Sequence, residues 1–201
     1  MKKRNVFIAL VMTMVFLLSA CGSGNSLVGK WTGSLDLTNQ IVQNMVASNA
    51  ATEKYAKFEN LKFTFVFEFT ETEASVRIDE ASTQQFIDNI KKGVADTVDA
   101  MVAGVAADNN RTVEEVYSGM GVTRDAYVQS VIEAMELETM VQTMVASMEL
   151  KGKYEADGEA ILILYDDNTY EEMKYNLGME DLTITVSDGT NDYQIHCTKT
   201  K

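Results

Sequence analysis

The chain has 201 residues, of which 46 % are hydrophobic and 23 % are charged, and its formal net charge is −13. This charge argues against a nucleic-acid partner, because binding of phosphates depends on Lys and Arg. The chain contains no proline, which excludes PxxP ligands and polyproline linkers. The length is that of one ordinary domain.

The N-terminal residues have the organisation of a secretory signal. Residues 2–4 are basic, and they precede an apolar run at residues 6–18 that is shorter than the about 20 residues of a membrane-spanning helix. The segment that follows, Leu18-Ser19-Ala20-Cys21, resembles a bacterial lipobox. The resemblance implies cleavage between Ala20 and Cys21 and lipidation of Cys21. The alternative is an ordinary cleaved signal that happens to end near a cysteine.

A lipidated Cys21 would anchor the protein to the cell membrane on its extracytoplasmic face, since two or more acyl chains give stable attachment. We therefore expect a signal peptide at residues 1–20 and a lipidated, flexible tether at residues 21–26. Cleavage removes three positive charges and leaves the mature chain more negative, so an anionic membrane would repel it weakly. We therefore expect the lipid, and not a basic patch, to make the attachment. Cys197 is then the one other cysteine, and it has no partner for an internal disulfide.

Alternating apolar residues predict three strands before residue 80. Residues 27–37 place Trp31 on an apolar face, and residues 61–70 place four phenylalanines on one face. A third strand follows a turn at residues 71–73 and includes Val76 and Ile78. Residues 38–57, between the first two strands, are predicted to be helical.

Helical spacing replaces the alternation over residues 81–149, which we interpret as a helical insertion. Ser82-Thr83-Gln84-Gln85 predicts a capping box for a helix that ends near residue 107. A second capping box at residues 112–115 predicts a short helix. Thr123 is expected to cap a longer helix that reaches about residue 149, with a slip of the apolar phase near residues 136–138.

Five more strands are predicted from residue 150 onward, separated by turns rich in Asp, Asn and Gly. Eight short strands joined by tight turns favour an up-and-down antiparallel barrel. The predicted fold is therefore mainly β with an α insertion (α+β). Residues 27–80 and 150–201 form the barrel, and residues 81–149 form a helical lobe between strands three and four.

Gly29-Lys30-Trp31 on the first strand is similar to the G-x-W motif of lipocalin-like (calycin) barrels. The resemblance implies that Trp31 packs across the closed end of the barrel. The chain departs from that family through its helical insertion and through the lack of an evident disulfide or Arg-bearing last strand to pack on Trp31. These departures resemble a group of Gram-positive lipoproteins that have helix-interrupted lipocalin-like domains and no assigned activity.

The residues that we expect to line an apolar cavity, if the barrel is hollow, are Trp31, Phe63, Phe65, Phe67 and Phe69. The alternative is that these rings fill the barrel or meet the helices. We expect no catalytic residue, cofactor or metal site. His196 is the single histidine and is predicted to face outward, while Cys197 is predicted to face the core.

Met140, Met144 and Met148 share one helix face, which favours packing over Cu(I) binding. Weak surface binding of Ca²⁺ also stays open. The predicted function is that of a non-enzymatic binding module for a small apolar ligand or a partner protein. The alternative is an interaction or chaperone-like surface protein that uses the helical lobe on a solid barrel.

Overall fold

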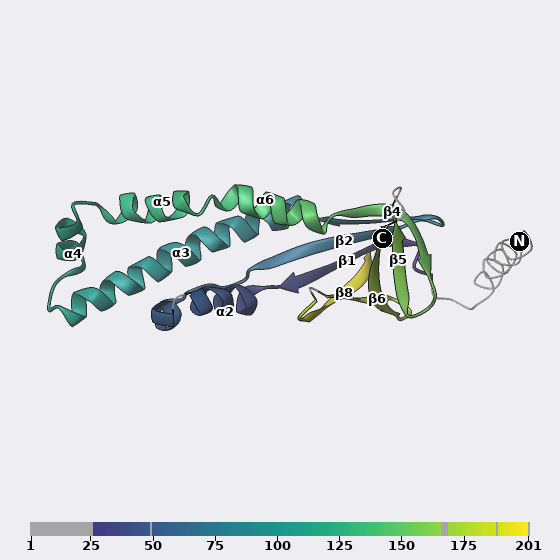
Figure 1. The fold of residues 1–201 in the computed structure, drawn as a ribbon, viewed down its shortest axis with the longest axis horizontal. Coiled ribbons are helices and arrows are strands. Elements are labelled where there is room, and N and C mark those ends of the chain that lie inside the picture. Colours follow the sequence, from purple (N-terminus) through teal and green to yellow (C-terminus); the bar gives the residue numbers. More distant parts are fainter. Residues whose placement is uncertain (1–25, 49, 166–168, 188, 201) are drawn as a thin grey trace, which may run out of the picture.

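The computed structural model describes residues 26–48, 50–165, 169–187 and 189–200. The molecule is elongated, with a barrel at one end of its long axis and a helical lobe at the other (Figure 1). Within the described residues, no helix combines the length and the apolar character needed to cross a membrane.

Eight antiparallel strands form a closed barrel in which each strand pairs with its neighbour in sequence and the last strand pairs with the first. The fold is consistent with a lipocalin-like barrel, and the predicted position of the helices between strands three and four is confirmed. The strands are β1 (Gly29–Asp36), β2 (Lys62–Phe69), β3 (Glu73–Ile78), β4 (Leu150–Ala156), β5 (Ala160–Leu164), β6 (Tyr170–Leu177), β7 (Asp181–Ser187) and β8 (Asp192–Thr200).

The pairing of β1 with β2 extends along both strands, from Gly29 opposite Phe69 to Asp36 opposite Lys62. In this register Trp31 lies opposite Phe67, and both side chains are fully buried. A shift of one residue would turn the aromatic face of β2 toward solvent, so burial of the rings fixes the register.

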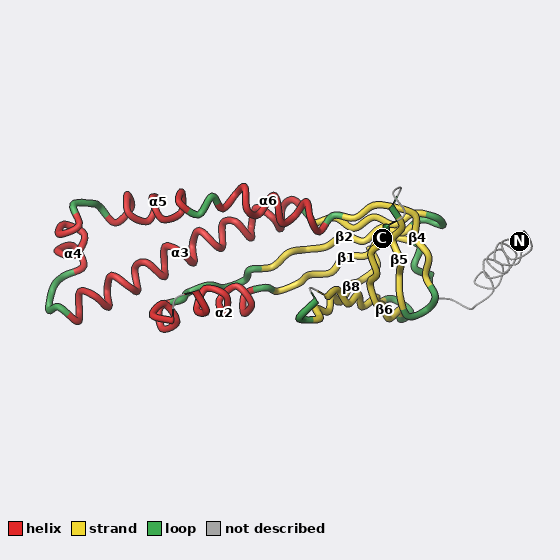
Figure 2. Tube along the Cα trace, in the orientation of Figure 1, coloured by secondary structure: helices red, strands yellow, loops and turns green. Residues whose placement is uncertain are grey.

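The helices form the lobe. A short α2 (Thr38–Ser48) and the 3₁₀ helix η2 (Ala50–Tyr55) connect β1 to β2. The long α3 (Glu80–Asp108) runs away from the barrel, α4 (Val113–Met120) forms the tip, and α5 (Arg124–Ala134) and α6 (Leu137–Met148) return beside α3 (Figures 1 and 2).

The capping box predicted at residues 82–85 is wrong, because α3 begins three residues earlier, at Glu80. Asp79 is the N-cap, and its carboxylate accepts a hydrogen bond of 3.0 Å from the backbone N–H of Ser82. The Ser82 hydroxyl donates to the Asp79 carbonyl and accepts from the backbone N–H of Thr64 on β2. Ser82 therefore ties the start of α3 to the barrel.

The other helix boundaries follow the sequence more closely. Thr112 and Glu115 form the predicted capping box of α4, and Thr123 caps α5. The helix predicted from Thr123 to about residue 149 is broken at Glu136, whose φ of 46° lies in the left-handed region. This break accounts for the phase slip in the sequence and divides the returning layer into α5 and α6.

The segment between β1 and β2 also packs on the lobe, which the sequence did not predict. The Phe58 ring occupies the space beside Gly93 of α3, where an added Cβ would lie 2.4 Å from a ring carbon. The Tyr55 hydroxyl lies in the same way beside Gly104. Between these two contacts, the buried Thr97 hydroxyl accepts a hydrogen bond from the backbone N–H of Lys57. Small residues on one face of α3 thus admit a second chain segment.

Barrel closure predicts that Gly33→Ala is destabilising. A Cβ at Gly33 would lie 2.6 Å from both Cys197 Sγ and the His196 carbonyl oxygen on β8. We expect a loss of about 1–3 kcal/mol in the free energy of unfolding, as for other overpacked sites. Urea unfolding of residues 22–201, which contain every described element, measures this difference.

Gly119→Ala is the matched control. Gly119 lies within α4, and the nearest atom to an added Cβ is a terminal nitrogen of Arg111 at 3.9 Å. Alanine is favoured over glycine inside a helix by up to about 1 kcal/mol, so this variant should be as stable as the parent or more stable. Equal stability of the two variants would contradict the close β1–β8 contact.

Candidate functional site

The aromatic residues predicted to line a cavity are all buried. Trp31, Phe63, Phe65, Phe67 and Phe69 are each at most 5 % exposed. The Phe65 and Phe67 rings have centroids 6.1 Å apart, and Phe69 meets Tyr154 of β4 edge-on at 5.3 Å. These rings therefore contact one another and the facing strands.

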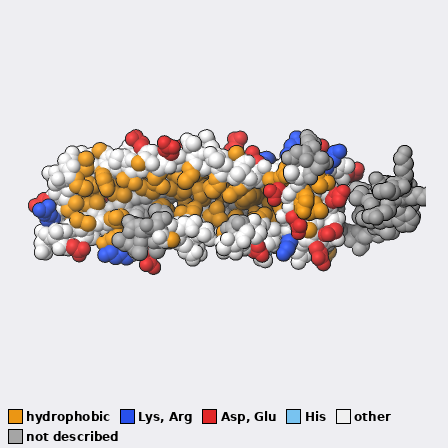
Figure 3. All heavy atoms as spheres, viewed as in Figure 1, with side chains coloured by type: hydrophobic (Ala, Val, Ile, Leu, Met, Phe, Trp, Pro, Cys, Tyr) orange, Lys and Arg blue, Asp and Glu red, His pale blue; other side chains and the backbone are white. Residues whose placement is uncertain are grey.

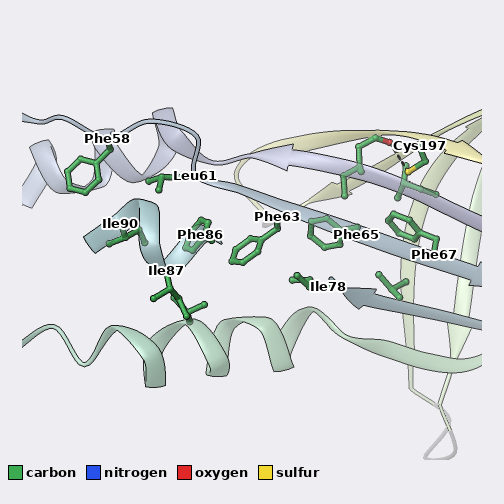
Figure 4. Close-up of a cluster of buried hydrophobic side chains, with 14 of the residues drawn as sticks. Phe58, Leu61, Phe63, Phe65, Phe67, Ile78, Phe86, Ile87, Ile90 and Cys197 are labelled. Atoms are coloured by element: carbon green, nitrogen blue, oxygen red, sulfur yellow. Dashed lines mark hydrogen bonds between the residues drawn. The ribbon is translucent and has the colours of Figure 1, made fainter. Parts of the chain in front are cut away.

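Phe63 differs from the others because it faces the lobe. Its ring stacks on Phe86 of α3 with a centroid separation of 4.1 Å. Figure 4 shows the two rings side by side at the point where the barrel meets the helices, with Ile87 and Ile90 continuing the cluster along α3. The apolar face of β2 thus extends from the barrel interior into the lobe.

Other inward positions of the barrel carry fully buried aliphatic side chains. These come from β5, β7 and β8: Ile161, Ile163, Leu182, Ile184 and Ile195. The side chains of the two halves pack into one hydrophobic cluster. A ligand between β2 and these strands would have to displace side chains that are in contact in this structure.

Trp31 lies at the end of the barrel where the described chain begins. Its indole N–H donates a hydrogen bond of 2.7 Å to the Leu27 carbonyl, and Lys199 Nζ lies 5.0 Å from its ring centroid. The sequence has no Arg on the last strand that could pack on Trp31. Lys199 of β8 takes this position as a cation over the ring.

Cys197 and His196 lie on opposite faces of β8, as predicted. Cys197 is 1 % exposed, and burial raises the pKa of its thiol to about 12. His196 is exposed, and its Nδ1 lies 3.1 Å from the Thr183 hydroxyl. The Cys197 thiol is therefore protonated and shielded at neutral pH, so it is no nucleophile in this state.

Two open depressions lie outside the barrel interior. One, of about 410 Å³, lies where β1 and β2 meet α3, and it is lined by polar residues that include Ser34, Asn60, Thr64 and Asn89. Several of these groups bond to one another. Ser34 pairs with Thr64 at 3.2 Å, and the Asn89 amide donates to the Asn60 carbonyl.

The other depression, of about 570 Å³, lies at the lobe tip between α4 and α5. Its lining includes Val113, Val122 and the buried Tyr117, whose hydroxyl makes no hydrogen bond of normal geometry with the described residues. Burial, with a smaller contribution from the Asp99 carboxylate, raises the pKa of Tyr117. Asp99 itself accepts hydrogen bonds of 2.8 and 2.6 Å from Arg124.

The returning layer of the lobe carries a partly exposed apolar surface. We define the α5–α6 apolar surface as the apolar side chains between Val131 and Met148 that are partly buried against the core, together with Met140, which is 51 % exposed. Its members are Val131, Ile132, Met135, Met140, Met144, Val145 and Met148. Figure 3 shows hydrophobic atoms in a nearly continuous band along one face of the lobe, from the tip to the barrel.

The sequence grouped three of these methionines on one helix face, but it could not show that the group is left partly uncovered. Met144 and Met148 are partly buried against the core, whereas Met140 is mostly outside it. The described residues include no group of three or more His, Cys, Asp and Glu that could hold a metal ion.

The predicted lipidation site, Cys21, and the cleavage site between Ala20 and Cys21 lie outside the described residues. No family model, curated protein or solved structure matches this chain. The functional argument therefore depends on the residues themselves.

The Cys197 thiol predicts a pH dependence of stability. Between about pH 9 and 12 the Cys197 thiol keeps its proton in the folded state and loses it in the unfolded state. The contribution of this thiol to the free energy of unfolding is therefore complete below this range and declines as pH rises through it. The decline in the free energy of unfolding approaches about 1.4 kcal/mol per pH unit. Urea unfolding of residues 22–201 between pH 8 and 10 should show a steeper loss of stability for the parent than for Cys197→Ala. Parallel pH profiles would contradict the shifted pKa.

Proposed function

We propose that this protein is a membrane-anchored, extracytoplasmic lipoprotein without enzymatic activity. Its filled barrel serves as a rigid scaffold, and its helical lobe binds a partner protein. The observation that carries this proposal is the α5–α6 apolar surface, which lies on the lobe and not at the barrel end where the described chain begins.

The arrangement of the chain supports an outward-facing lobe. β1 begins at the barrel end and runs toward the lobe, and α4 lies at the opposite end of the long axis (Figure 1). The first described residue, Ser26, is held to the barrel because its carbonyl accepts a hydrogen bond from Lys199 Nζ at 3.4 Å. A lipid on Cys21 would therefore attach at the barrel end, and the lobe would extend away from the bilayer.

The packing of the barrel favours a partner protein over a small ligand inside it. The aromatic row and the aliphatic residues opposite it are nearly inaccessible and contact one another. The lobe, in contrast, carries the partly exposed aliphatic and Met side chains of the α5–α6 apolar surface. Figure 3 shows hydrophobic atoms along one face of the lobe. Exposed apolar surfaces of this kind mark sites of interaction with other proteins.

The anchor is tested by Cys21→Ala. We expect this variant to incorporate no labelled fatty acid, because the modified thiol is absent. We also expect less of the protein to remain in washed membranes. Cys197→Ala is the matched control, since it removes the other cysteine, and it should label as the parent does. Labelling of the Cys21→Ala variant would contradict the lipobox interpretation.

The role of the lobe is tested by photo-crosslinking on intact cells that produce the protein. A photoreactive residue at the exposed Met140 of α6 should give a discrete adduct with another protein, and one at the exposed Met179, between β6 and β7, should not. Equal adducts at both positions, or adducts at Met179 alone, would contradict a partner-binding lobe. Point substitution is preferable to deletion of residues 81–149, because deletion would uncover Phe63.

A further inference from the structure

We infer that the α5–α6 apolar surface binds a cationic amphipathic helix presented by the partner. This inference rests on the proposed function and specifies the chemistry of the partner. It draws on the shape of the surface, the type of side chain on it, and the charge of the surrounding lobe.

The shape of the surface suits a helix. α5 and α6 run beside α3, which has 29 residues and is therefore about 43 Å long. An 18-residue helix is about 27 Å long and fits along this face. Helices of this kind bind through apolar side chains spaced at i, i+3, i+4 and i+7.

The side chains suit an apolar helix face. Four of the seven members of the surface are methionines, namely Met135, Met140, Met144 and Met148. Unbranched thioether side chains adjust their shape at low cost, so methionine is common on surfaces that bind apolar helix faces. The surface is thus adaptable as well as apolar.

The charge of the lobe identifies a cationic partner. Residues 80–149 contain twelve Asp and Glu residues but four Lys and Arg residues. Three of these cations already form ion pairs within the lobe: Lys91 with Glu138, Lys92 with Asp96, and Arg124 with Asp99 and Asp125. Eight of the twelve carboxylates have no ion pair among the described residues, so the lobe attracts positive charge.

Part of this negative charge lies next to the apolar surface. Glu133, Glu136 and Glu149 directly follow Ile132, Met135 and Met148 in the sequence, and all three glutamates are exposed. A Lys or Arg at the edge of a bound apolar helix would lie within reach of them. This pattern complements an amphipathic helix that is apolar on one face and basic on the other.

The same charge disfavours two other occupants. A second copy of this chain would bring an equal excess of carboxylates to the interface. An anionic bilayer would repel the lobe, and the lobe extends away from the predicted attachment point. A basic helix of a partner satisfies both the apolar and the electrostatic features.

The test uses residues 22–201, which contain every described element, and three fluorescent 18-residue peptides. The first has Leu on one helix face and Lys on the other, the second is a scramble of the same composition, and the third replaces Lys with Glu. We expect fluorescence anisotropy to show binding of the first peptide that weakens as salt is raised. The scramble and the Glu peptide should bind at least tenfold more weakly.

Two pairs of variants locate the site. Met140→Lys should weaken binding of the Leu/Lys peptide at least fivefold, whereas Met179→Lys, which makes the same charge change at a residue 85 % exposed, should change it less than twofold. The triple variant Glu133→Gln, Glu136→Gln and Glu149→Gln should weaken binding about three- to tenfold. The triple variant Glu171→Gln, Glu172→Gln and Glu180→Gln, all exposed on the barrel, should not. Circular dichroism checks that each variant is folded.

Equal binding of the scramble, or equal losses in the barrel variants, would overturn the inference and indicate attraction by net charge alone. If sedimentation experiments show self-association of residues 22–201, and if Met140→Lys abolishes this self-association, the inference is overturned in favour of a second copy as the occupant. If the peptides fail but Met140 still crosslinks to a partner in cells, the inference falls and the proposed function stands. If Met140 and Met179 crosslink alike, the proposed function falls.

Discussion

The stacking of Phe63 on Phe86 is the contact on which the shape of the molecule depends. It joins the inward face of β2 to the inward face of α3, so that one hydrophobic cluster runs from the barrel into the lobe. Ser82 strengthens the same junction through its hydrogen bonds to Asp79 and to the backbone of Thr64. Because barrel and lobe share a core, the lobe is held as a rigid extension of the sheet.

The lobe is assembled from two separate parts of the chain. The long insertion supplies α3 to α6, and the shorter connection between β1 and β2 supplies the segment that packs beside Gly93 and Gly104. α3 therefore packs on this segment as well as on α5 and α6, whereas α5 and α6 pack on α3, and α6 also packs on β3. Partly exposed apolar side chains remain on α5 and α6.

Local periodicity was sufficient to predict most of the fold, because strands and helices of this chain each have a strongly one-sided apolar pattern. The eight strands, the capping box of Thr112, the cap of Thr123 and the slip of the apolar phase near Glu136 could all be found in this way. The cap of α3 was missed because both Asp79 and Ser82 are suitable residues, and only the geometry shows which one accepts from the helix.

The candidate site was less accessible to sequence analysis. The aromatic row is evident in the sequence, but whether its rings surround a space depends on residues of β5, β7 and β8 that lie far away in the chain. The α5–α6 apolar surface was equally hidden, since periodicity shows that Met144 and Met148 share a face but not how completely that face is covered. Lys199 lies 168 positions after Trp31, and barrel closure alone brings them together.

The orientation of β1 has a mechanical consequence. This strand connects the end of the molecule at Ser26 to the lobe, and it is hydrogen-bonded to β2 on one edge and to β8 on the other. A force applied between a membrane anchor and a partner on the lobe would act parallel to β1. The ladders on both edges would then be loaded in shear, with many hydrogen bonds sharing the force at once, and the strand would resist extraction far better than one peeled from an open edge.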